Sequence, residues 1–310
     1  MLRAIREFFS ARGVLEVETP LLGSFSVTDP HLRPFETRFC PAGHEAECLP
    51  RYLQTSPEFA MKRLLAAGAG SIYQICKSFR NSELGRWHNP EFTLLEWYRV
   101  ECGLPELMDE AETLLDSLFH ESREFHRSER VSYREVFQQL VGVDPILAGL
   151  EDFRECAQKL DYAEARALCG IERSTWLDFL FSQAVQPHLG RECITFVYDF
   201  PGCLPSLARS KDGDPSVVER VEVFLDGVEL ANGFHELGDP VEQEQRLDRD
   251  IEVRKAHGAE ILSKDPRLLA ALRAGLPDCS GIAMGLDRLL MILTDAKDIT
   301  EVLAFPFELA

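Results

Sequence analysis

The chain has 310 residues, of which 52 are acidic and 33 basic, so its formal net charge at pH 7 is −19. Nucleic-acid-binding proteins usually carry a basic surface, so this charge argues against RNA or DNA and suits a protein partner with a basic target loop. The chain contains no signal peptide and no run of about 18 apolar residues that could span a membrane. Nine scattered cysteines without a CxxC pair are typical of reduced thiols, and we expect a cytoplasmic protein.

The first elements alternate between helix and strand. Apolar residues at helical spacing predict a helix over 2–12, and alternation predicts a strand over 14–19. A second helix is predicted over 57–67, with Ser56 as its N-cap and Pro57 at its first position.

The segment 76–99 then predicts two strands joined by a long polar loop, with Arg80 at the end of the first strand. Because side chains alternate along a strand, one face of the second strand carries an aromatic ring, a carboxylate and a phenol. The residues on that face are Phe92, Leu94, Glu96 and Tyr98. An aromatic ring, a carboxylate and a phenol beside an arginine are side chains suited to binding a nucleotide next to a cationic small molecule. An amphipathic hairpin with a solvated charged face is the alternative.

The remainder of the chain predicts a mostly helical region over 103–190, a strand over 194–201 and a charged helix over 240–257. A hairpin is predicted around the Asp226-Gly227 pair, which is a strong two-residue turn signal. Without internal repeats or a low-complexity linker, 1–310 is interpreted as a single α/β domain.

Two glutamates of this hairpin predict a metal site. Regular pairing places Phe224 opposite Glu229 and Glu222 opposite Ala231, so the two glutamates are diagonal neighbours with Cα atoms about 7–8 Å apart. Carboxylates at that distance repel unless a cation lies between them, and Mg²⁺ bound to ATP phosphates fits oxygen ligands best. Two solvated glutamates are the alternative.

Several segments resemble one enzyme family in the order in which that family has them. FRNSELGRWHNPEF, within 72–99, resembles motif 2 of the class II aminoacyl-tRNA synthetases in its lysyl-type form. GVLEVETPLL (13–22, with the helix before it) resembles motif 1, and GIAMGLDRLLMIL (281–293) resembles motif 3. TSPEFAMKRL (55–64) and VEVFLDGVELANGFHEL (221–237) resemble the lysine-pocket segments of lysyl-tRNA synthetases. The resemblance implies an antiparallel sheet flanked by helices.

The resemblance assigns a nucleotide site. Arg80 would hold the carboxylate and the α-phosphate, Arg288 would meet the γ-phosphate and cover the adenine, and Phe92 would stack on the ring from the other side. Further ATP-binding positions implied are Asn81, Ser82, Glu83, His88, Asn89, Glu229, Leu230 and Gly285. One departure is that Ser82 stands where the family has a glutamate that contacts the adenine amine. Either Glu83 takes over that contact or backbone groups alone bind the base.

The resemblance also assigns a lysine pocket. Glu236 and Tyr98 would hold the ε-ammonium, and Glu58 and Glu96 would hold the inner amino group, because a buried ammonium must be paired. Ser56 and Pro57 would lie against the substrate. Asn232 would bind its carboxylate, which requires an irregularity near Gly233. Ala283 replaces the middle glycine of the family pattern, and its methyl group favours an amine on the β-carbon over one on the α-carbon.

The motif 1 helix is predicted to begin at Leu2, so we expect this chain to lack the OB-fold anticodon-binding domain that lysyl-tRNA synthetases have before it. The chain therefore resembles the stand-alone paralogues of that enzyme, the elongation factor P lysine lysyltransferases, also called elongation factor P–(R)-β-lysine ligases. This implies a homodimer that uses ATP and Mg²⁺ to attach lysine or β-lysine to a lysine of elongation factor P, without tRNA or membrane. A minimal tRNA-charging enzyme, a non-catalytic binding module and a class II asparagine synthetase are the alternatives.

Overall fold

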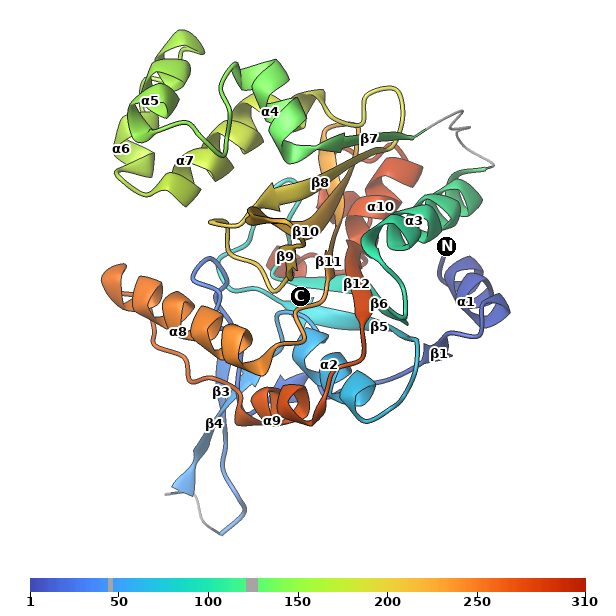
Figure 1. Ribbon diagram of the computed structural model, residues 1–310. Helices are drawn as coiled ribbons and strands as arrows, with labels where there is room; N and C mark the ends of the chain where they lie inside the picture. The colour runs from blue at the N-terminus through green and yellow to red at the C-terminus, as the bar shows by residue number, and fades with distance from the viewer. Residues whose placement is uncertain (44–46, 121–127) are drawn as a thin grey trace. The chain divides into compact units, whose positions relative to one another are not determined.

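The computed structural model describes residues 1–43, 47–120 and 128–310. These residues form two compact units (Figure 1). Unit 1 comprises Met1–Cys102 and Glu236–Ala310, and unit 2 comprises Gly103–His235. Each unit contains mostly antiparallel strands with helices packed on them, which confirms the predicted mixed fold class.

Unit 1 contains the first eight elements of the chain and the last six. The first eight are α1 (Leu2–Ala11), β1 (Leu15–Glu16), β2 (Leu22–Gly23), β3 (Glu36–Phe39), β4 (Leu49–Leu53), α2 (Glu58–Ala66), β5 (Ile72–Phe79) and β6 (Glu91–Val100). The last six are α8 (Pro240–Ala256), α9 (Pro266–Ala274), β12 (Cys279–Gly285), α10 (Leu286–Leu293) and the short 3-10 helices η4 (Ile299–Glu301) and η5 (Phe307–Leu309).

The strands β5, β6 and β12 form the part of unit 1 that carries the candidate site. β6 pairs with β5 on one side and with β12 on the other, both antiparallel, and β1 pairs with β5 in parallel. The apolar face of α1 packs on this sheet, where Phe9 stacks on Tyr73 at 4.5 Å between ring centroids and approaches Trp97 at 5.4 Å. α1 ends at Ala11, one residue before the predicted end of the motif 1 helix. The strand predicted over 14–19 is shorter in the structure, where β1 comprises Leu15–Glu16.

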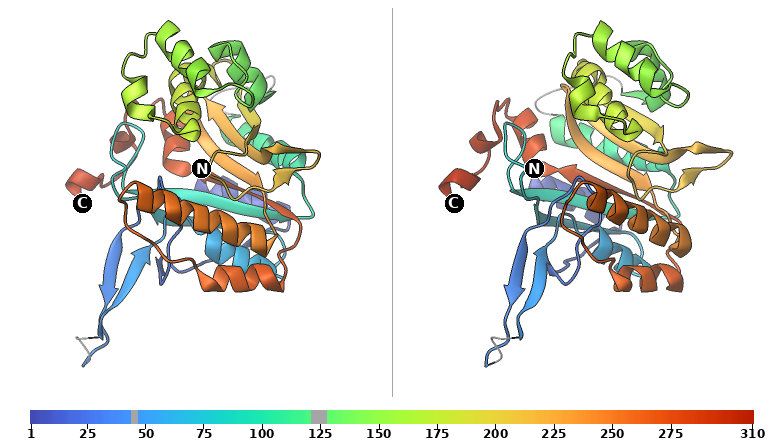
Figure 2. Two further views of the ribbon diagram at one scale, coloured as in Figure 1. Left: turned by 60° about the vertical axis from the view of Figure 1, so that its left-hand side comes forward. Right: turned by 90° about the vertical axis from the view of Figure 1, so that its left-hand side faces the viewer.

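β4 pairs antiparallel with β2 and with β3, and the β3–β4 ribbon extends away from the β5–β6–β12 sheet of unit 1 (Figure 2). Cys40 and Cys48, which directly follow and precede these strands, form a disulfide with Cα atoms 4.2 Å apart. The prediction that all nine cysteines are thiols is therefore wrong for this pair. The register brings the two residues together because Phe39 faces Leu49 in the ribbon.

Unit 2 contains the remaining elements. They are α3 (Leu104–Phe119), β7 (Glu129–Ser132), α4 (Tyr133–Val141), α5 (Leu150–Lys159), α6 (Ala165–Cys169), α7 (Arg173–Leu180), the π-helix η2 (Phe181–Val185), the 3-10 helix η3 (Gln186–His188), β8 (Thr195–Pro201), β9 (Ser210–Lys211), β10 (Asp214–Leu225) and β11 (Val228–His235). The region 103–190 is thus mostly helical, as predicted, with β7 as an addition. β10 pairs antiparallel with β11, β8 and β9, and β7 runs parallel to β8.

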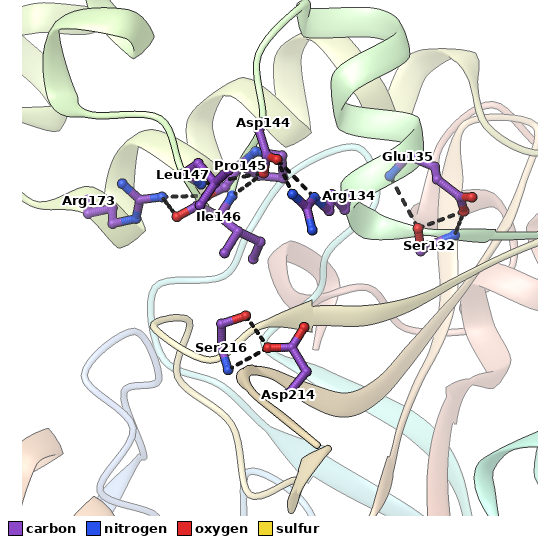
Figure 3. A network of polar contacts seen from close by, with 10 residues as sticks. All are labelled: Ser132, Arg134, Glu135, Asp144, Pro145, Ile146, Leu147, Arg173, Asp214 and Ser216. Carbon is purple, nitrogen blue, oxygen red and sulfur yellow. Dashed lines mark hydrogen bonds and ion pairs between the residues drawn. The ribbon is translucent and has the colours of Figure 1, made fainter. Parts of the chain in front are cut away.

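An aromatic core and a set of polar contacts hold unit 2 together. Tyr133 stacks on Phe181 at 4.8 Å and lies 5.0 Å from Phe200. Arg173 donates to the carbonyl oxygens of Pro145 and Ile146 at 2.5 and 2.9 Å (Figure 3), which ties α7 to the loop before α5. Figure 3 also shows the capping box of α4, in which the Ser132 hydroxyl and the Glu135 carboxylate satisfy each other's backbone N–H groups.

Two further predictions concern helices and membranes. α2 is assigned from Glu58 with Pro57 as the residue before it, one residue later than predicted, but the Ser56 hydroxyl accepts a hydrogen bond from the Glu58 N–H at 3.3 Å, the contact predicted for an N-cap side chain. The charged helix over 240–257 is confirmed as α8.

Among the described residues, no helix combines the length and apolar character needed to cross a membrane.

Candidate active site

Unit 1 gathers a buried group of acids at the start of α2, on β6 and just before α8. Glu96 and Tyr98 lie two residues apart on β6, and the Tyr98 hydroxyl donates to Glu96 Oε1 at 2.6 Å. Glu58 and Glu236 lie close together, since both contact the same ammonium group, that of Lys62, at 2.7 and 2.6 Å, and the pKa of Glu96 is raised first by burial and then by Glu58 and Glu236. The structure thus brings together the four residues predicted to hold the two ammonium groups of the substrate.

A lysine that the sequence analysis did not single out lies among these acids. Lys62, one turn after Glu58 on α2, places its Nζ 2.7 Å from Glu58 Oε1 and 2.6 Å from Glu236 Oε2. The side chains of Lys62 and Glu236 are each only 1% exposed. The i,i+4 spacing from Glu58 was a signal in the sequence, because residues at this spacing are neighbours on a helix.

Burial dominates the electrostatics of this pocket. Burial, followed by the nearby Glu58, raises the pKa of Glu96 to about 8, and burial also raises the pKa of Glu236 against the effect of Lys62. Burial alone would lower the pKa of Lys62, but Glu236 and Glu58 outweigh it and the pKa is raised. Lys62 is therefore charged at neutral pH, whereas Glu96, whose pKa is raised to about 8, is mostly protonated there, and a cation bound beside it favours its ionised form.

The register of β12 against β6 sets the floor of the pocket. Gly281 faces Tyr98, Ala283 faces Glu96 and Gly285 faces Leu94. A Cβ atom at Gly281 would overlap the ring of Tyr98 and lie 2.7 Å from Glu236 Oε1. The methyl group of Ala283 lies in the row of Glu96, as the proposed contact with the substrate amine requires.

Polar atoms without partners mark the same face of the sheet. Gln74 on β5 faces Glu96 in the register and is 1% exposed. Among the described residues, the two amide atoms of Gln74 have no hydrogen-bond partner of normal geometry. The same is true of Oε2 of Glu96. Buried polar groups normally find partners, so this arrangement is typical of a site that binds a polar ligand. The sequence analysis did not single out Gln74.

The predicted nucleotide residues cluster at the other end of β6. The Arg80 guanidinium lies 5.1 Å from the centroid of the Phe92 ring and 3.7 Å from Glu83 Oε1. In the first turn of α10, Arg288 contacts His88 Nε2 at 2.6 Å and donates to the Trp87 carbonyl at 3.2 Å. Both arginines and an aromatic ring therefore converge on the loop between β5 and β6.

The loop itself is held by backbone contacts. Asn89 is buried; it donates to the Glu91 carbonyl at 2.6 Å and accepts from the Phe307 N–H at 3.0 Å, which attaches the C-terminal segment to the loop. The Asn81 N–H donates to the Arg33 carbonyl at 2.7 Å. Ser82, the departure from the family pattern, has a φ of 74°, a conformation unusual for a residue other than glycine.

The predicted metal ligands lie on the β10–β11 hairpin of unit 2. Asp226 and Gly227 both have positive φ, as a type I′ turn requires, which confirms the predicted turn. The predicted pairing beyond it is partly wrong. Phe224 faces Glu229 as expected, but Glu222 faces Asn232 and not Ala231.

A β-bulge is the physical reason for this correction. The register shifts between Val223 and Phe224, so Leu230 is the extra residue on β11. Leu230 and Ala231 are consequently both buried in succession. The shift turns Asn232 to the face that carries Glu222 and Glu229. The irregularity required for Asn232 therefore exists, but it lies at Leu230 and not near Gly233.

Arg220 joins the same face and was missed by the sequence analysis. Its Nε donates to Asn232 Oδ1 at 3.1 Å and its Nη2 to Glu222 Oε1. Burial raises the pKa of Glu222, opposed by Arg220 and assisted by Glu229. No cluster of three or more acidic, histidine or cysteine side chains suited to a metal occurs in the described part of the chain. Two carboxylates nevertheless fit Mg²⁺, which usually takes one or two from the protein and its other oxygens from phosphates and water.

The fold and these residues define a class II synthetase catalytic domain. Residues 1–309 match the family model of class II tRNA synthetases (D, K and N), and the chain belongs to this family. Among its relatives is the elongation factor P–(R)-β-lysine ligase of Salmonella dublin, 48% identical over 306 residues that cover 99% of this chain and 92% of the relative. The proteins of the same name from Salmonella arizonae and Salmonella paratyphi B match with the same identity and coverage.

Proposed function

We propose that the chain activates (R)-β-lysine or lysine with ATP and transfers it to a lysine side chain of elongation factor P. The observation that carries the proposal is the group of Glu58, Glu96 and Glu236, joined through Lys62 and Tyr98 beside the β6 strand that also carries Phe92. Three acids this close together suit an amino acid with a second amino group, and the names of the relatives, elongation factor P–(R)-β-lysine ligases, indicate the acceptor.

The reaction has two steps. In the first, an oxygen of the substrate carboxylate attacks the α-phosphorus of ATP, the bond to the β-phosphate breaks, and pyrophosphate leaves. In the second, the acceptor amine attacks the acyl carbon of the adenylate, the bond to AMP breaks, and the amine loses a proton. The chain's part is to position two anions and to aim cations at the charge that develops. Arg80 and Arg288 are the catalytic residues for this.

The remaining site residues take supporting roles. Glu222 and Glu229 hold Mg²⁺, which neutralises phosphate charge when bound. Asn232 holds the substrate carboxylate through its amide N–H groups, since its Oδ1 accepts from Arg220. The ATP-binding residues are Asn81, Ser82, Glu83, His88, Asn89, Phe92, Leu230 and Gly285, and Ser56, Pro57 and Ala283 line the amino-acid pocket.

We also infer a homodimer and an acceptor other than tRNA. The motif 1 segment exposes four leucines, Leu2, Leu15, Leu21 and Leu22, at 38–56% of their surface. Four large apolar side chains exposed along one short segment favour a surface that is covered in a dimer. The net charge of −19 disfavours tRNA. Analytical ultracentrifugation tests the dimer; a monomer at micromolar concentration contradicts it.

ATP–pyrophosphate exchange tests the first step. We expect exchange that depends on β-lysine or lysine and is lost in Arg80→Ala and Arg288→Ala. A chain that exchanges pyrophosphate with asparagine or aspartate but not with a diamino acid would refute the substrate class. A chain that charges tRNA with lysine more efficiently than it modifies elongation factor P would favour the minimal synthetase.

A further inference from the structure

Lys62 contacts two carboxylates that have different tasks in the proposed function. Its ammonium lies 2.7 Å from Glu58 Oε1 and 2.6 Å from Glu236 Oε2. Glu58 is assigned to the inner amino group of the substrate and Glu236 to the ε-ammonium. A single buried cation of the chain therefore links both halves of the diamino-acid pocket.

The charges of the pocket match the substrate only if Lys62 is included. Three carboxylates, Glu58, Glu96 and Glu236, carry three negative charges when all are ionised, and Lys62 compensates one of them. Two negative charges remain, and the proposed substrate brings two ammonium groups into the same space. Without Lys62, one buried negative charge would have no partner, which is costly in a medium of low dielectric constant.

Lys62 also fixes the orientation of the carboxylates. It uses Oε2 of Glu236, while Oε1 of the same group lies near Gly281 and the Tyr98 ring on the pocket floor. It uses Oε1 of Glu58. Oε2 of Glu96 has no hydrogen-bond partner among the described residues. Lys62 therefore fixes one oxygen each of Glu58 and Glu236, and Oε2 of Glu96 is left to accept from a bound ammonium group.

We propose that Lys62 is a positioning residue that holds Glu58 and Glu236 and sets the pocket charge for a substrate with two ammonium groups. The proposal rests on the proposed function, because it takes a diamino acid as the substrate. It differs from a purely structural ion pair in one respect. Loss of Lys62 should impair the use of the amino acid and leave the use of ATP unchanged.

The test is ATP–pyrophosphate exchange by Lys62→Met, with KM measured separately for the diamino acid and for ATP. Methionine keeps an unbranched side chain as far as the ε position and removes the ammonium group with its charge. The matched control is Lys255→Met, which removes an exposed lysine that is paired with Glu252 at 2.6 Å on α8. We expect the KM for the diamino acid to rise by about tenfold or more in Lys62→Met, and both KM values to stay within about twofold of the parent in the control.

A folded Lys62→Met variant whose diamino-acid KM is within about twofold of the parent would overturn the proposal. So would a variant in which the KM for ATP rises as much as the KM for the amino acid. If Lys62→Met does not fold, Lys62→Gln is measured in the same way, since glutamine can still donate to one carboxylate but carries no charge. A parent enzyme that exchanges with no diamino acid would refute the proposed function itself, so the two failures are distinguishable.

Discussion

Two glycines of β12 offer a sharp test of the pocket geometry. A Cβ atom at Gly281 would overlap the Tyr98 ring and approach Glu236 Oε1 to 2.7 Å, whereas a Cβ atom at Gly285 would meet nothing closer than Arg288 Cδ at 3.8 Å. Neither glycine has positive φ, so alanine is compatible with the backbone at both positions. Gly281→Ala and Gly285→Ala are therefore a matched pair that differs in the space around the added methyl group.

The cost of Gly281→Ala follows from the packing of Tyr98. The ring is 2% exposed and packs with Met61, Leu65 and Ile72, so it cannot move away without disturbing this core. Added volume in a well-packed core typically costs about 1–3 kcal/mol. We expect Gly281→Ala to lose this much free energy of unfolding, and Gly285→Ala to remain within about 0.5 kcal/mol of the parent.

Urea denaturation and pyrophosphate exchange measure the two consequences. Because the displaced Tyr98 hydroxyl is bonded to Glu96 at 2.6 Å, Gly281→Ala should raise the KM for the diamino acid. Gly285→Ala should instead raise the KM for ATP, since Gly285 is assigned to the nucleotide. The reasoning is refuted if Gly281→Ala is as stable as Gly285→Ala and binds the amino acid as well as the parent does.

Three further predictions concern single residues. Ala283→Gly should shift the ratio of β-lysine to lysine activation toward lysine; an unchanged ratio in pyrophosphate exchange contradicts the role of the methyl group. Burial raises the pKa of Glu96 to about 8, so its contribution to stability is present below the unfolded-state value of 4.5 and is lost as pH rises toward 8. Between pH 4.5 and 8, the free energy of unfolding should decline less in Glu96→Gln than in the parent. Parallel pH profiles for the two proteins would contradict the raised pKa of Glu96. Glu222→Gln and Glu229→Gln should each raise the Mg²⁺ concentration for half-maximal exchange, while equal Mg²⁺ dependence in parent and variants counts against the metal site.

Local sequence signals predicted most elements correctly. The Asp226-Gly227 pair requires positive φ at both positions, and the hairpin forms around it. Helical periodicity predicted helices over 2–12 and 57–67, and each end agrees with α1 and α2 to within one residue. Alternation on β6 placed Glu96 and Tyr98 on one face, as their hydrogen bond shows.

Features that depend on tertiary packing were not predicted. An irregularity was expected near Gly233, but no local turn or breaker residue marks its actual position at Leu230, where it changes the partner of Glu222. Lys62 has the sequence context of a solvated lysine on a helix surface, and only the folded pocket buries it between two acids. The Cys40–Cys48 disulfide depends on the register of β3 and β4, which spacing alone does not determine.

The most direct test of the account is the intact mass of elongation factor P after incubation with this chain, ATP and (R)-β-lysine. We expect the mass to increase by one β-lysyl group, the increase to require ATP, and Arg80→Ala to abolish it. An unchanged mass under conditions in which the same chain esterifies tRNA with lysine would contradict the account.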